Sequence, residues 1–277
     1  MNNTDIWRIG TDGSAAIAFL TSTLRDTSPQ YSPDGQRIAF ESGRGGDSIA
    51  IWLANADGSE ATQATRLANE QCGSPRWSPE GRWIAFDCLE PEGGWDIWAI
   101  EASGASPRRL THGAGDNIAP SWSHDGRWIY YGAKRSGRFE IWRVPSAGGA
   151  VRQVTRNGGY IAFESVDGSV LFYTLSEFGS EGLFAKRLPD GDEVPLIRER
   201  IGRRGFAVFS DGIYYLGAAG PDFKIRFYQF ATRVTRTLAE VEGQLQLGLA
   251  VSPDRKSFLF SKVVFSGSDL MLIENFR

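Results

Sequence analysis

The sequence is poor in the residues that most often carry catalysis or bind metal ions. Its 277 residues include only two histidines, His112 and His124, and only two cysteines, Cys72 and Cys88. A histidine-based metal centre or a Ser-His-Asp triad needs such side chains to converge, and the chain contains no Gly-x-Ser-x-Gly motif. We therefore expect no catalytic residues of these kinds, no metal and no cofactor, and leave open only a calcium site made of carboxylates.

Long apolar runs and an excess of basic charge are also missing. No segment approaches the roughly 18 uninterrupted apolar residues of a membrane span, and the net charge of −3 provides no basic face for nucleic acid. The first residues lack the basic and apolar stretches of a signal peptide, so we expect none. With 41% hydrophobic and 23% charged residues, the composition predicts a soluble globular chain, which we expect to be monomeric.

What the chain does contain is a turn motif that recurs about every 45 residues, a spacing typical of repeat architectures. It reads Tyr-Ser-Pro-Asp-Gly at residues 31–35, and related motifs occupy residues 77–81, 122–126, 165–168, 210–212 and 252–255. A glycine at the last turn position allows a positive φ angle, and the preceding acid can accept backbone hydrogen bonds. One acid recurs in each motif, which predicts a structural role for Asp34, Glu80, Asp125, Asp167, Asp211 and Asp254.

The third copy indicates what one repeat builds. Residues 120–123 and 128–131 predict two strands that flank the turn, residues 140–144 predict a third strand, and residues 151–155 predict a fourth. Aromatic and branched residues occupy adjacent positions, so both faces of such a sheet need to be buried. A four-stranded antiparallel sheet that is repeated radially is a propeller blade. The predicted fold class is therefore all-β, and six turn motifs predict a six-bladed β-propeller.

The two ends of the chain indicate how the ring closes. Residues 5–9 and 17–20 predict third and fourth strands with no hairpin before them, whereas residues 269–273 predict a third strand with no fourth strand after it. We expect residues 1–24 to supply ring-closing outer strands to the blade that contains the last repeat. Residues 25–277 then hold six repeat units, so that 1–277 is a single propeller domain. A seventh, partial blade is the alternative.

The hairpins resemble the TolB-type (WD-like) propeller repeat, which reads Pro-x-aromatic-Ser-Pro-Asp-Gly followed by an Ile-Ala-Phe-like strand. Residues 29–40 and 75–86 match closely, and residues 120–131 match apart from His124. The fourth copy departs from the pattern with Glu164 in place of the aromatic residue, and the sixth has Arg255 at the glycine position. If that position has a positive φ angle, arginine costs about 1 kcal/mol there.

More narrowly, the chain looks like the C-terminal propeller region of CadC-like membrane-anchored winged-helix transcriptional regulators. In such proteins a DNA-binding domain and a membrane helix precede the propeller. Neither element is seen in these 277 residues, so a DNA-binding role is not carried over. The resemblance implies a sensory or interaction module, which would be periplasmic or extracytoplasmic in such a regulator and cytoplasmic otherwise.

The loops that lead from one blade's outer strand to the next blade's inner strand surround one mouth of a propeller channel. In this chain they carry acids, amides and arginines that can bind a polar ligand or a peptide terminus, namely Asp26, Gln71, Asp116, Asn117, Tyr160, Arg203, Arg204 and Gln246. Glu164 needs a partner or access to the channel, because it is a carboxylate in an inner strand. The candidate binding residues are Asp26, Asp116, Asn117, Glu164, Arg203 and Arg204. The alternatives are solvated loop residues and, for Glu164, a paired structural charge.

The two cysteines give a geometric prediction. If Ser78 pairs with Arg82 across the turn, Cys72 and Cys88 lie directly opposite each other on two strands. Such a pair can approach disulfide geometry, and a closed loop of about 15 residues would contribute roughly 3 kcal/mol. Two reduced cysteines that pack as small apolar side chains are the alternative.

Taken together, these patterns favour a non-catalytic binding or sensory module that recognises a protein, a peptide or a small polar ligand at one mouth. Three alternatives stay open, because one fold supports many functions. They are a propeller enzyme, a gating propeller of a peptidase that acts at the central channel, and a purely structural scaffold.

Overall fold

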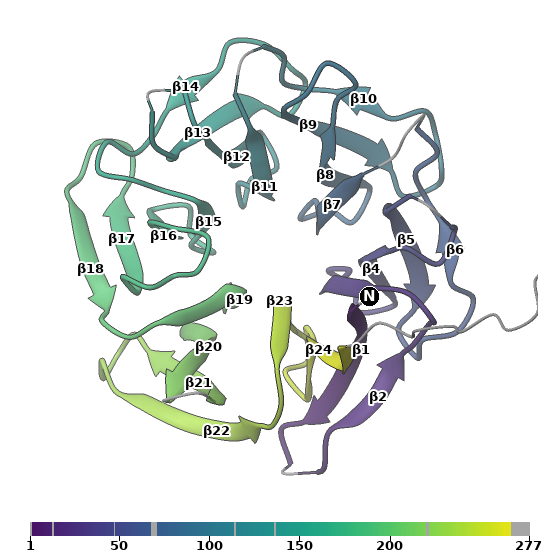
Figure 1. The fold of residues 1–277 in the computed structure, drawn as a ribbon. Coiled ribbons are helices and arrows are strands. Elements are labelled where there is room, and N and C mark those ends of the chain that lie inside the picture. The colour runs from purple at the N-terminus through teal and green to yellow at the C-terminus, as the bar shows by residue number, and fades with distance from the viewer. Residues whose placement is uncertain are drawn as a thin grey trace, which may run out of the picture.

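The structure is a computed structural model that describes residues 2–266 apart from 13, 47, 68–70, 114, 136 and 220–221. Six four-stranded antiparallel sheets stand side by side in a ring around a central channel (Figure 1). The prediction of an all-β, six-bladed propeller is therefore confirmed. Within the described ranges, no helix is long and apolar enough to cross a membrane.

Each blade has four strands, which follow one another from the channel outwards. Blade 1 consists of β3 (Asp26–Tyr31), β4 (Arg37–Ser42), β5 (Ala50–Asn55) and β6 (Thr62–Gln63). Blade 2 consists of β7 (Cys72–Trp77), β8 (Trp83–Leu89), β9 (Trp95–Glu101) and β10 (Arg108–Arg109). Blade 3 consists of β11 (Asn117–Trp122), β12 (Trp128–Ala133), β13 (Glu140–Pro145) and β14 (Arg152–Gln153).

The second half of the ring follows the same plan. Blade 4 consists of β15 (Ile161–Glu164), β16 (Val170–Thr174), β17 (Leu183–Arg187) and β18 (Glu193–Ile197). Blade 5 consists of β19 (Ile201–Val208), β20 (Gly212–Ala219), β21 (Asp222–Gln229) and β22 (Thr235–Val241). Blade 6 consists of β23 (Leu245–Val251), β24 (Ser257–Ser266), β1 (Asn2–Gly10) and β2 (Ile17–Leu20).

The second strand of a blade is apolar at consecutive positions because its residues face two different neighbours. In β8, Phe86 packs in the core between blades 1 and 2, whereas Ala85 packs in the core between blades 2 and 3. Both residues are fully buried. The adjacent apolar residues seen in the sequence thus fill interfaces on both faces of each sheet, and these interfaces hold the inner strands around the channel.

Four of the six recurrent turn acids organise their turns locally, namely Asp34, Asp125, Asp167 and Asp254. In blade 1, Asp34 Oδ1 accepts hydrogen bonds from Ser32 Oγ at 2.6 Å and from the Gln36 backbone N–H at 3.0 Å. Gly35 has a φ angle of +70°. Arg255 takes the corresponding position in blade 6 with a φ angle of +59°, a conformation that costs a residue with a Cβ atom about 1 kcal/mol.

The N-terminal strands close the ring, as predicted. The sheet order in blade 6 is β23, β24, β1 and β2, and Ile6 of β1 pairs with Ser261 of β24. The first and the last described strands are therefore hydrogen-bonded neighbours, which leaves no open sheet edge between the two ends of the ring. The further strand predicted at residues 269–273 lies outside the described residues.

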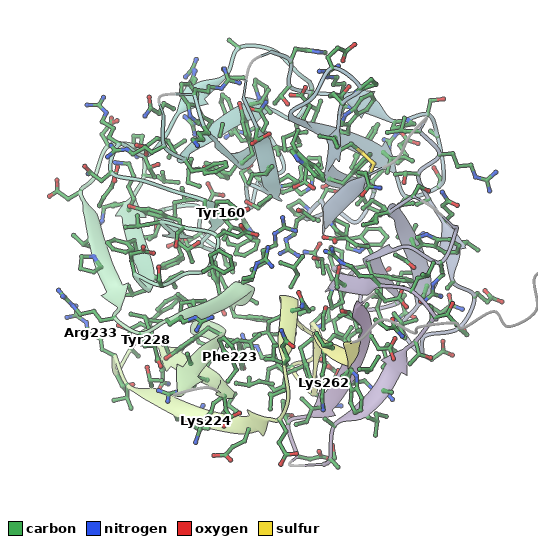
Figure 2. The ribbon with its side chains drawn as sticks, viewed as in Figure 1. Tyr160, Phe223, Lys224, Tyr228, Arg233 and Lys262 are labelled. Carbon is green, nitrogen blue, oxygen red and sulfur yellow. A yellow bond between two sulfur atoms is a disulfide. The ribbon has the colours of Figure 1, made fainter. Side chains whose placement is uncertain are left out.

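The two cysteines lie opposite each other in blade 2. Cys72 of β7 pairs directly with Cys88 of β8, and a disulfide bond joins them (Figure 2). Both residues are buried. The disulfide ties the inner strand of blade 2 to its second strand at the end of the channel where β7 begins.

The register that led to this pairing is nevertheless wrong at the turn. The Ser78 backbone N–H donates to the Trp83 carbonyl oxygen at 2.8 Å, so Ser78 does not pair with Arg82. A bulge between Gly73 and Arg76 then shifts the register before the cysteines are reached. The cysteines face each other because the bulge compensates for the one-residue difference at the turn.

Candidate functional site at the central channel

Each inner strand runs through the ring from one mouth of the channel to the other. In β7, Gly73 lines a cavity at one mouth and Trp77 lines a cavity at the other. We call the first the entrance mouth, because the inner strands begin there, and the second the turn mouth, because turn prolines such as Pro33 and Pro253 line it. The entrance cavity measures about 470 Å³ and the turn cavity about 330 Å³. Both volumes suit a small ligand or part of a peptide.

Polar side chains from several blades line the entrance cavity. Five of the eight loop residues expected at this mouth are in the cavity wall, namely Gln71, Asp116, Tyr160, Arg203 and Arg204. Tyr160 is directed towards the channel (Figure 2), and its ring packs edge-on against Phe139 with 5.0 Å between the ring centroids. The wall therefore combines charged groups with aromatic surface, as binding sites for peptides commonly do.

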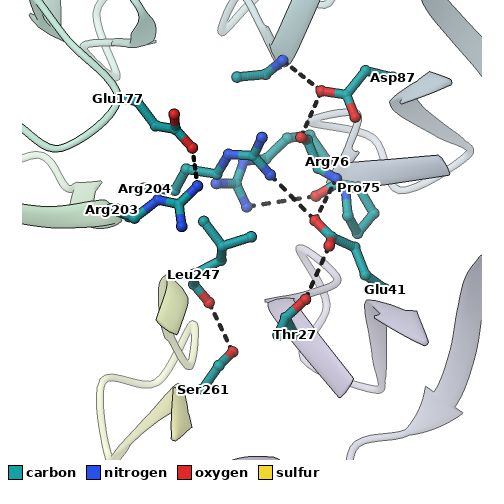
Figure 3. A network of polar contacts seen from close by, with 12 residues as sticks. Thr27, Glu41, Pro75, Arg76, Asp87, Glu177, Arg203, Arg204, Leu247 and Ser261 are labelled. Carbon is teal, nitrogen blue, oxygen red and sulfur yellow. Dashed lines mark hydrogen bonds and ion pairs between the residues drawn. The ribbon is translucent and has the colours of Figure 1, made fainter. Parts of the chain in front are cut away.

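A buried ion pair bridges the channel at this cavity. Arg204 of blade 5 donates from Nη1 to Glu41 Oε1 of blade 1 at 3.2 Å (Figure 3). Blades 5 and 1 are separated by blade 6, so the contact joins inner parts of the ring that do not share an interface. Burial acts to raise the pKa of Glu41, but the charges of Arg25 and Arg204 outweigh it and hold that pKa below its ordinary value.

Glu41 also connects blade 1 to blade 2, and Asp87 repeats this connection one blade later. Glu41 Oε1 accepts a hydrogen bond from the Ser74 backbone N–H at 2.8 Å. Asp87 Oδ2 accepts one from the Ala119 backbone N–H of blade 3 at 2.7 Å. Ser74 and Ala119 both have positive φ angles and lie at bulges of their inner strands. Burial raises the pKa of Asp87, against the opposing effect of the Arg204 charge.

Two arginines at the rim of the entrance cavity remain partly exposed. The Arg203 side chain is 34% exposed, forms an ion pair with Glu177, and lies 5.1 Å over the Phe178 ring. The Arg25 side chain is 40% exposed and reaches Glu41 Oε2 at 3.2 Å. Each rim cation is thus held in position by a carboxylate while part of its surface faces solvent.

Two of the predicted site residues, Asp26 and Asn117, are not part of the wall of the entrance cavity. Asp26 is fully buried and accepts an ion-pair contact from Arg44 at 2.8 Å within blade 1. Asn117 is also buried and donates to Asp96 Oδ1 at 2.9 Å across the interface between blades 2 and 3. The structure places both side chains inside the protein, where they connect strands.

Glu164 lies at the turn mouth, away from the other candidate residues. Its carboxylate accepts hydrogen bonds from the His124 backbone N–H at 2.6 Å and from the Tyr130 hydroxyl at 2.7 Å. Both partners belong to blade 3, so Glu164 connects blade 4 to blade 3. Of the six candidate residues, three therefore lie at the entrance mouth (Asp116, Arg203 and Arg204) and Glu164 lies at the turn mouth, whereas Asp26 and Asn117 are buried between strands.

Four channel residues were missed by the sequence reasoning: Arg25, Glu41, Arg76 and Asp87. A signal for two of them was present, because Glu41 and Asp87 each follow an Ile-Ala-Phe segment in a strand that is otherwise buried. A charged residue in such a strand needs a partner or a channel. Arg76 occupies the variable position of the Pro-x-aromatic motif. The residue type at that position does not indicate whether the side chain points into the channel.

Aromatic side chains dominate the turn cavity. Its wall includes Trp77, Trp122, Phe163, Phe206 and Phe209. Arg76 lies in the same wall, next to Arg204 in the middle of the channel (Figure 3). This cavity thus combines aromatic rings with one basic group, Arg76, and one carboxylate, Glu164.

Neither histidine belongs to these cavities. His112 is exposed in the loop after β10, and His124 is exposed in the turn between β11 and β12. Across the part of the chain that the structure describes, no three His, Cys, Asp or Glu side chains gather in a way that could hold a metal ion. The polar chemistry of the channel therefore rests on arginines and carboxylates that pair with one another.

Comparisons with known proteins agree with this architecture. A profile of the TolB beta propeller domain family (PD40) matches residues 61–247. The protein Atu1656 of Agrobacterium fabrum (strain C58) is 51% identical over 47 residues, which make up 17% of this chain and 16% of that protein.

Two solved structures share the fold. The crystal structure of TolB from Acinetobacter baumannii is 20% identical with a TM-score of 0.70, and the match covers 86% of this chain and 63% of that chain. A puromycin-hydrolyzing peptidase of Mycobacterium tuberculosis is 16% identical with a TM-score of 0.60, and the match covers 85% of this chain and 42% of that one. The chain spans less than two thirds of each of these proteins, and identities this low show the fold alone.

Proposed function

The chain belongs to the TolB beta propeller domain family, and we propose that it is a non-catalytic binding module that recognises an acidic segment of a protein or peptide at its entrance mouth. The observation that carries this proposal is the pair of partly exposed rim cations, Arg25 and Arg203, beside a cavity of about 470 Å³. Anionic groups can pair with the solvent-facing side of these two cations, next to the carboxylates Asp116 and Glu177 of the same wall.

The rim is also pre-organised. Arg203 is held by Glu177 and by the Phe178 ring, and Arg25 is held by the buried Glu41. A partner therefore meets cations whose side-chain freedom is already restricted, which lowers the entropy lost on binding. Tyr160 and Phe139 supply aromatic surface in the same cavity, and aromatic side chains are frequent anchors in protein interfaces.

The proposal is tested by selecting peptides from a random display library against the unaltered protein and measuring their dissociation constants by calorimetry. We expect selected peptides to be acidic, and the double variant Arg25→Glu/Arg203→Glu to weaken their binding at least tenfold. The matched control is Arg82→Glu/Arg127→Glu, which reverses two charges near the turn mouth whose side chains are 68% and 80% exposed. The control should change binding less than twofold.

Equal binding by both double variants would refute recognition at the entrance mouth. The failure to select any peptide that discriminates between them would favour the structural scaffold. The sensory role implied by the resemblance to CadC-like regulators is one setting for such a module, in which the bound segment would be the signal.

A gating propeller is a second candidate, because the fold is shared with a puromycin-hydrolyzing peptidase. In this chain the pair of Arg204 and Glu41 bridges the channel, so a peptide could pass only if that ion pair opened. Turnover of fluorogenic peptide substrates by the purified chain would contradict the non-catalytic proposal. Unchanged substrates, together with the rim-dependent peptide binding described above, would support it.

A further inference from the structure

The channel contains a buried cation without a carboxylate partner among the described residues. Arg76 of β7 is only 5% exposed and takes part in none of the ion pairs found there. Its Nε atom is buried without a hydrogen-bond partner, and Nη1 makes a single long contact of 3.5 Å with the Pro75 carbonyl oxygen. A charged group removed from water in this way is unfavourable unless an anion joins it.

Arg76 nevertheless keeps its charge. Burial and the nearby charge of Arg204 lower the pKa of Arg76 to about 10, which still leaves the guanidinium protonated at neutral pH. The charges of Glu41 and Asp87, which lie in the same part of the channel, partly oppose this lowering. Neither carboxylate contacts Arg76 in an ion pair: Glu41 is engaged by Arg25 and Arg204, and Asp87 accepts hydrogen bonds from the Ser74 hydroxyl and the Ala119 backbone N–H. The hydrogen-bonding capacity of Arg76 is therefore available to a ligand.

The surroundings of Arg76 determine what kind of anion fits. The guanidinium lies 5.0 Å over the Phe163 ring, and the remaining wall of the turn cavity includes Trp77, Trp122 and Phe206. A small inorganic anion would leave this aromatic wall unfilled, whereas an apolar group would remove its surface from water. Glu164, in the same wall, already accepts two hydrogen bonds from blade 3.

We propose that the turn cavity is a second binding site, which takes a small monocarboxylate with an aromatic group. The carboxylate pairs with the Arg76 guanidinium, whose planar set of donors matches two carboxylate oxygens. The aromatic group lies among the rings of the cavity wall. This site is separate from the entrance mouth and does not depend on the partner recognition proposed there.

The first experiment compares two probes that differ only in charge, with the unaltered full chain in a calorimeter. N-acetyl-L-phenylalanine is expected to bind saturably, and N-acetyl-L-phenylalaninamide is expected to bind at least tenfold more weakly. Acetate, which keeps the charge without the ring, should also bind at least tenfold more weakly than the aromatic acid. No saturable binding of the acid, or equal binding of acid and amide, would overturn the proposal, and equal binding of acetate would overturn the role of the aromatic wall.

The second experiment assigns the binding to Arg76. The variant Arg76→Gln should weaken binding of the aromatic acid at least tenfold, whereas Arg203→Gln at the other mouth should change it less than twofold. Circular dichroism and thermal unfolding establish that both variants are folded. If Arg76→Gln does not fold, the acid and amide comparison on the unaltered chain decides the proposal.

The two proposals fail separately. The entrance-mouth variant Arg25→Glu/Arg203→Glu is expected to lose acidic peptides and to keep the aromatic acid. Loss of both ligands in that variant would show that the two cavities are not independent and would contradict the separate site.

Discussion

The interfaces between blades differ in what connects a second strand to the inner strand of the next blade. Between blades 1 and 2 the connector is Glu41, and between blades 2 and 3 it is Asp87. The corresponding residue of blade 3 is Gly132, where an added Cβ atom would lie 2.3 Å from the Tyr160 carbonyl oxygen. Between blades 3 and 4, therefore, backbone packs directly where a carboxylate stands in the first two interfaces.

The interface between blades 3 and 4 does contain a carboxylate, but at its opposite end. Glu164 accepts its hydrogen bonds from blade 3 at the turn mouth, whereas Glu41 and Asp87 lie in the wall of the entrance cavity. A blade interface can thus hold a buried carboxylate at either mouth, provided that backbone or hydroxyl donors meet it. Glu41 and Asp87 thus place negative charge at the entrance mouth, and Glu164 places it at the turn mouth.

Among the substitutions that test this difference between interfaces, Glu41→Ala should cause the largest loss of stability. The substitution leaves Arg204 buried without its ion-pair contact and removes the acceptor of the Ser74 N–H, so we expect a loss of about 3–5 kcal/mol in the free energy of unfolding. Denaturant unfolding measures it. The control Glu101→Ala removes a surface ion pair with Arg82 and should cost at most about 1 kcal/mol. Similar losses in both variants would mean that the channel carboxylate has no special role.

Removal of the disulfide should cause the second-largest loss of stability. Cys72 and Cys88 are separated by 16 positions, and a closed loop of this size contributes about 3 kcal/mol in the chain-entropy model. The double variant Cys72→Ser/Cys88→Ser should lower the unfolding free energy by about that amount, and a reducing agent should destabilise the parent protein but not the variant. An unchanged response of the parent to reductant would contradict the prediction.

Gly132→Ala tests the direct packing between blades 3 and 4. Because the new Cβ atom would meet the Tyr160 carbonyl oxygen at 2.3 Å, the two blades need to move apart, at a cost of about 1–3 kcal/mol. The matched control is Gly43→Ala, where the nearest atom, Leu24 Cβ, lies at an ordinary 3.5 Å. Thermal unfolding should separate the two variants, and equal melting temperatures would show that this contact is not tight.

The smallest predicted effect is on the pH dependence of stability. It should differ between the interface of blades 1 and 2, which contains Glu41, and the interface of blades 2 and 3, which contains Asp87. The pKa of Glu41 is lowered, so its contribution is present above the unfolded pKa and is lost as the pH falls through the folded one. The destabilisation caused by Glu41→Gln should therefore shrink towards low pH.

Asp87 should behave in the opposite way, because its pKa is raised. The folded state takes up its proton first, so the parent gains stability relative to Asp87→Asn as the pH falls from neutral. Each unit of pKa shift corresponds to about 1.4 kcal/mol. Unfolding free energies are measured across an acidic pH series for the parent and for both variants. As the pH falls, the difference between parent and Glu41→Gln should shrink, whereas the parent should gain stability relative to Asp87→Asn. If the stability curves of both variants run parallel to that of the parent, the prediction is wrong.

The fold could be predicted from the sequence because the repeated turn and the aromatic strands act locally. Six turn motifs determined six blades, and the unpaired strands at residues 5–9 and 17–20 indicated the closure of blade 6. Each turn motif lies within a few residues of the hairpin that it forms, whereas ring closure pairs Ile6 with the distant Ser261 and was inferred from the strands that each end of the chain lacks. The prediction needed no knowledge of which blades meet across the channel.

The site was predicted less well because its contacts join residues far apart in the chain. Arg204 and Glu41 are 163 positions apart, and no local pattern links them. Asp26 and Asn117 were placed at the mouth from their loop positions, but inner strands begin at these residues and bury them. A bulge of one residue also decided which side chains of β7 face the channel, and hydrophobic periodicity does not reveal such a bulge.

Ring closure also dictates an order of events during synthesis. Strand β1 is made first and finds its partner only when β24, at Ser257–Ser266, has left the ribosome. Until then one edge of β1 has no strand to pair with, which favours misassociation of the incompletely folded chain. A chaperone that shields Asn2–Gly10 during this interval would therefore protect a strand edge until its distant partner arrives.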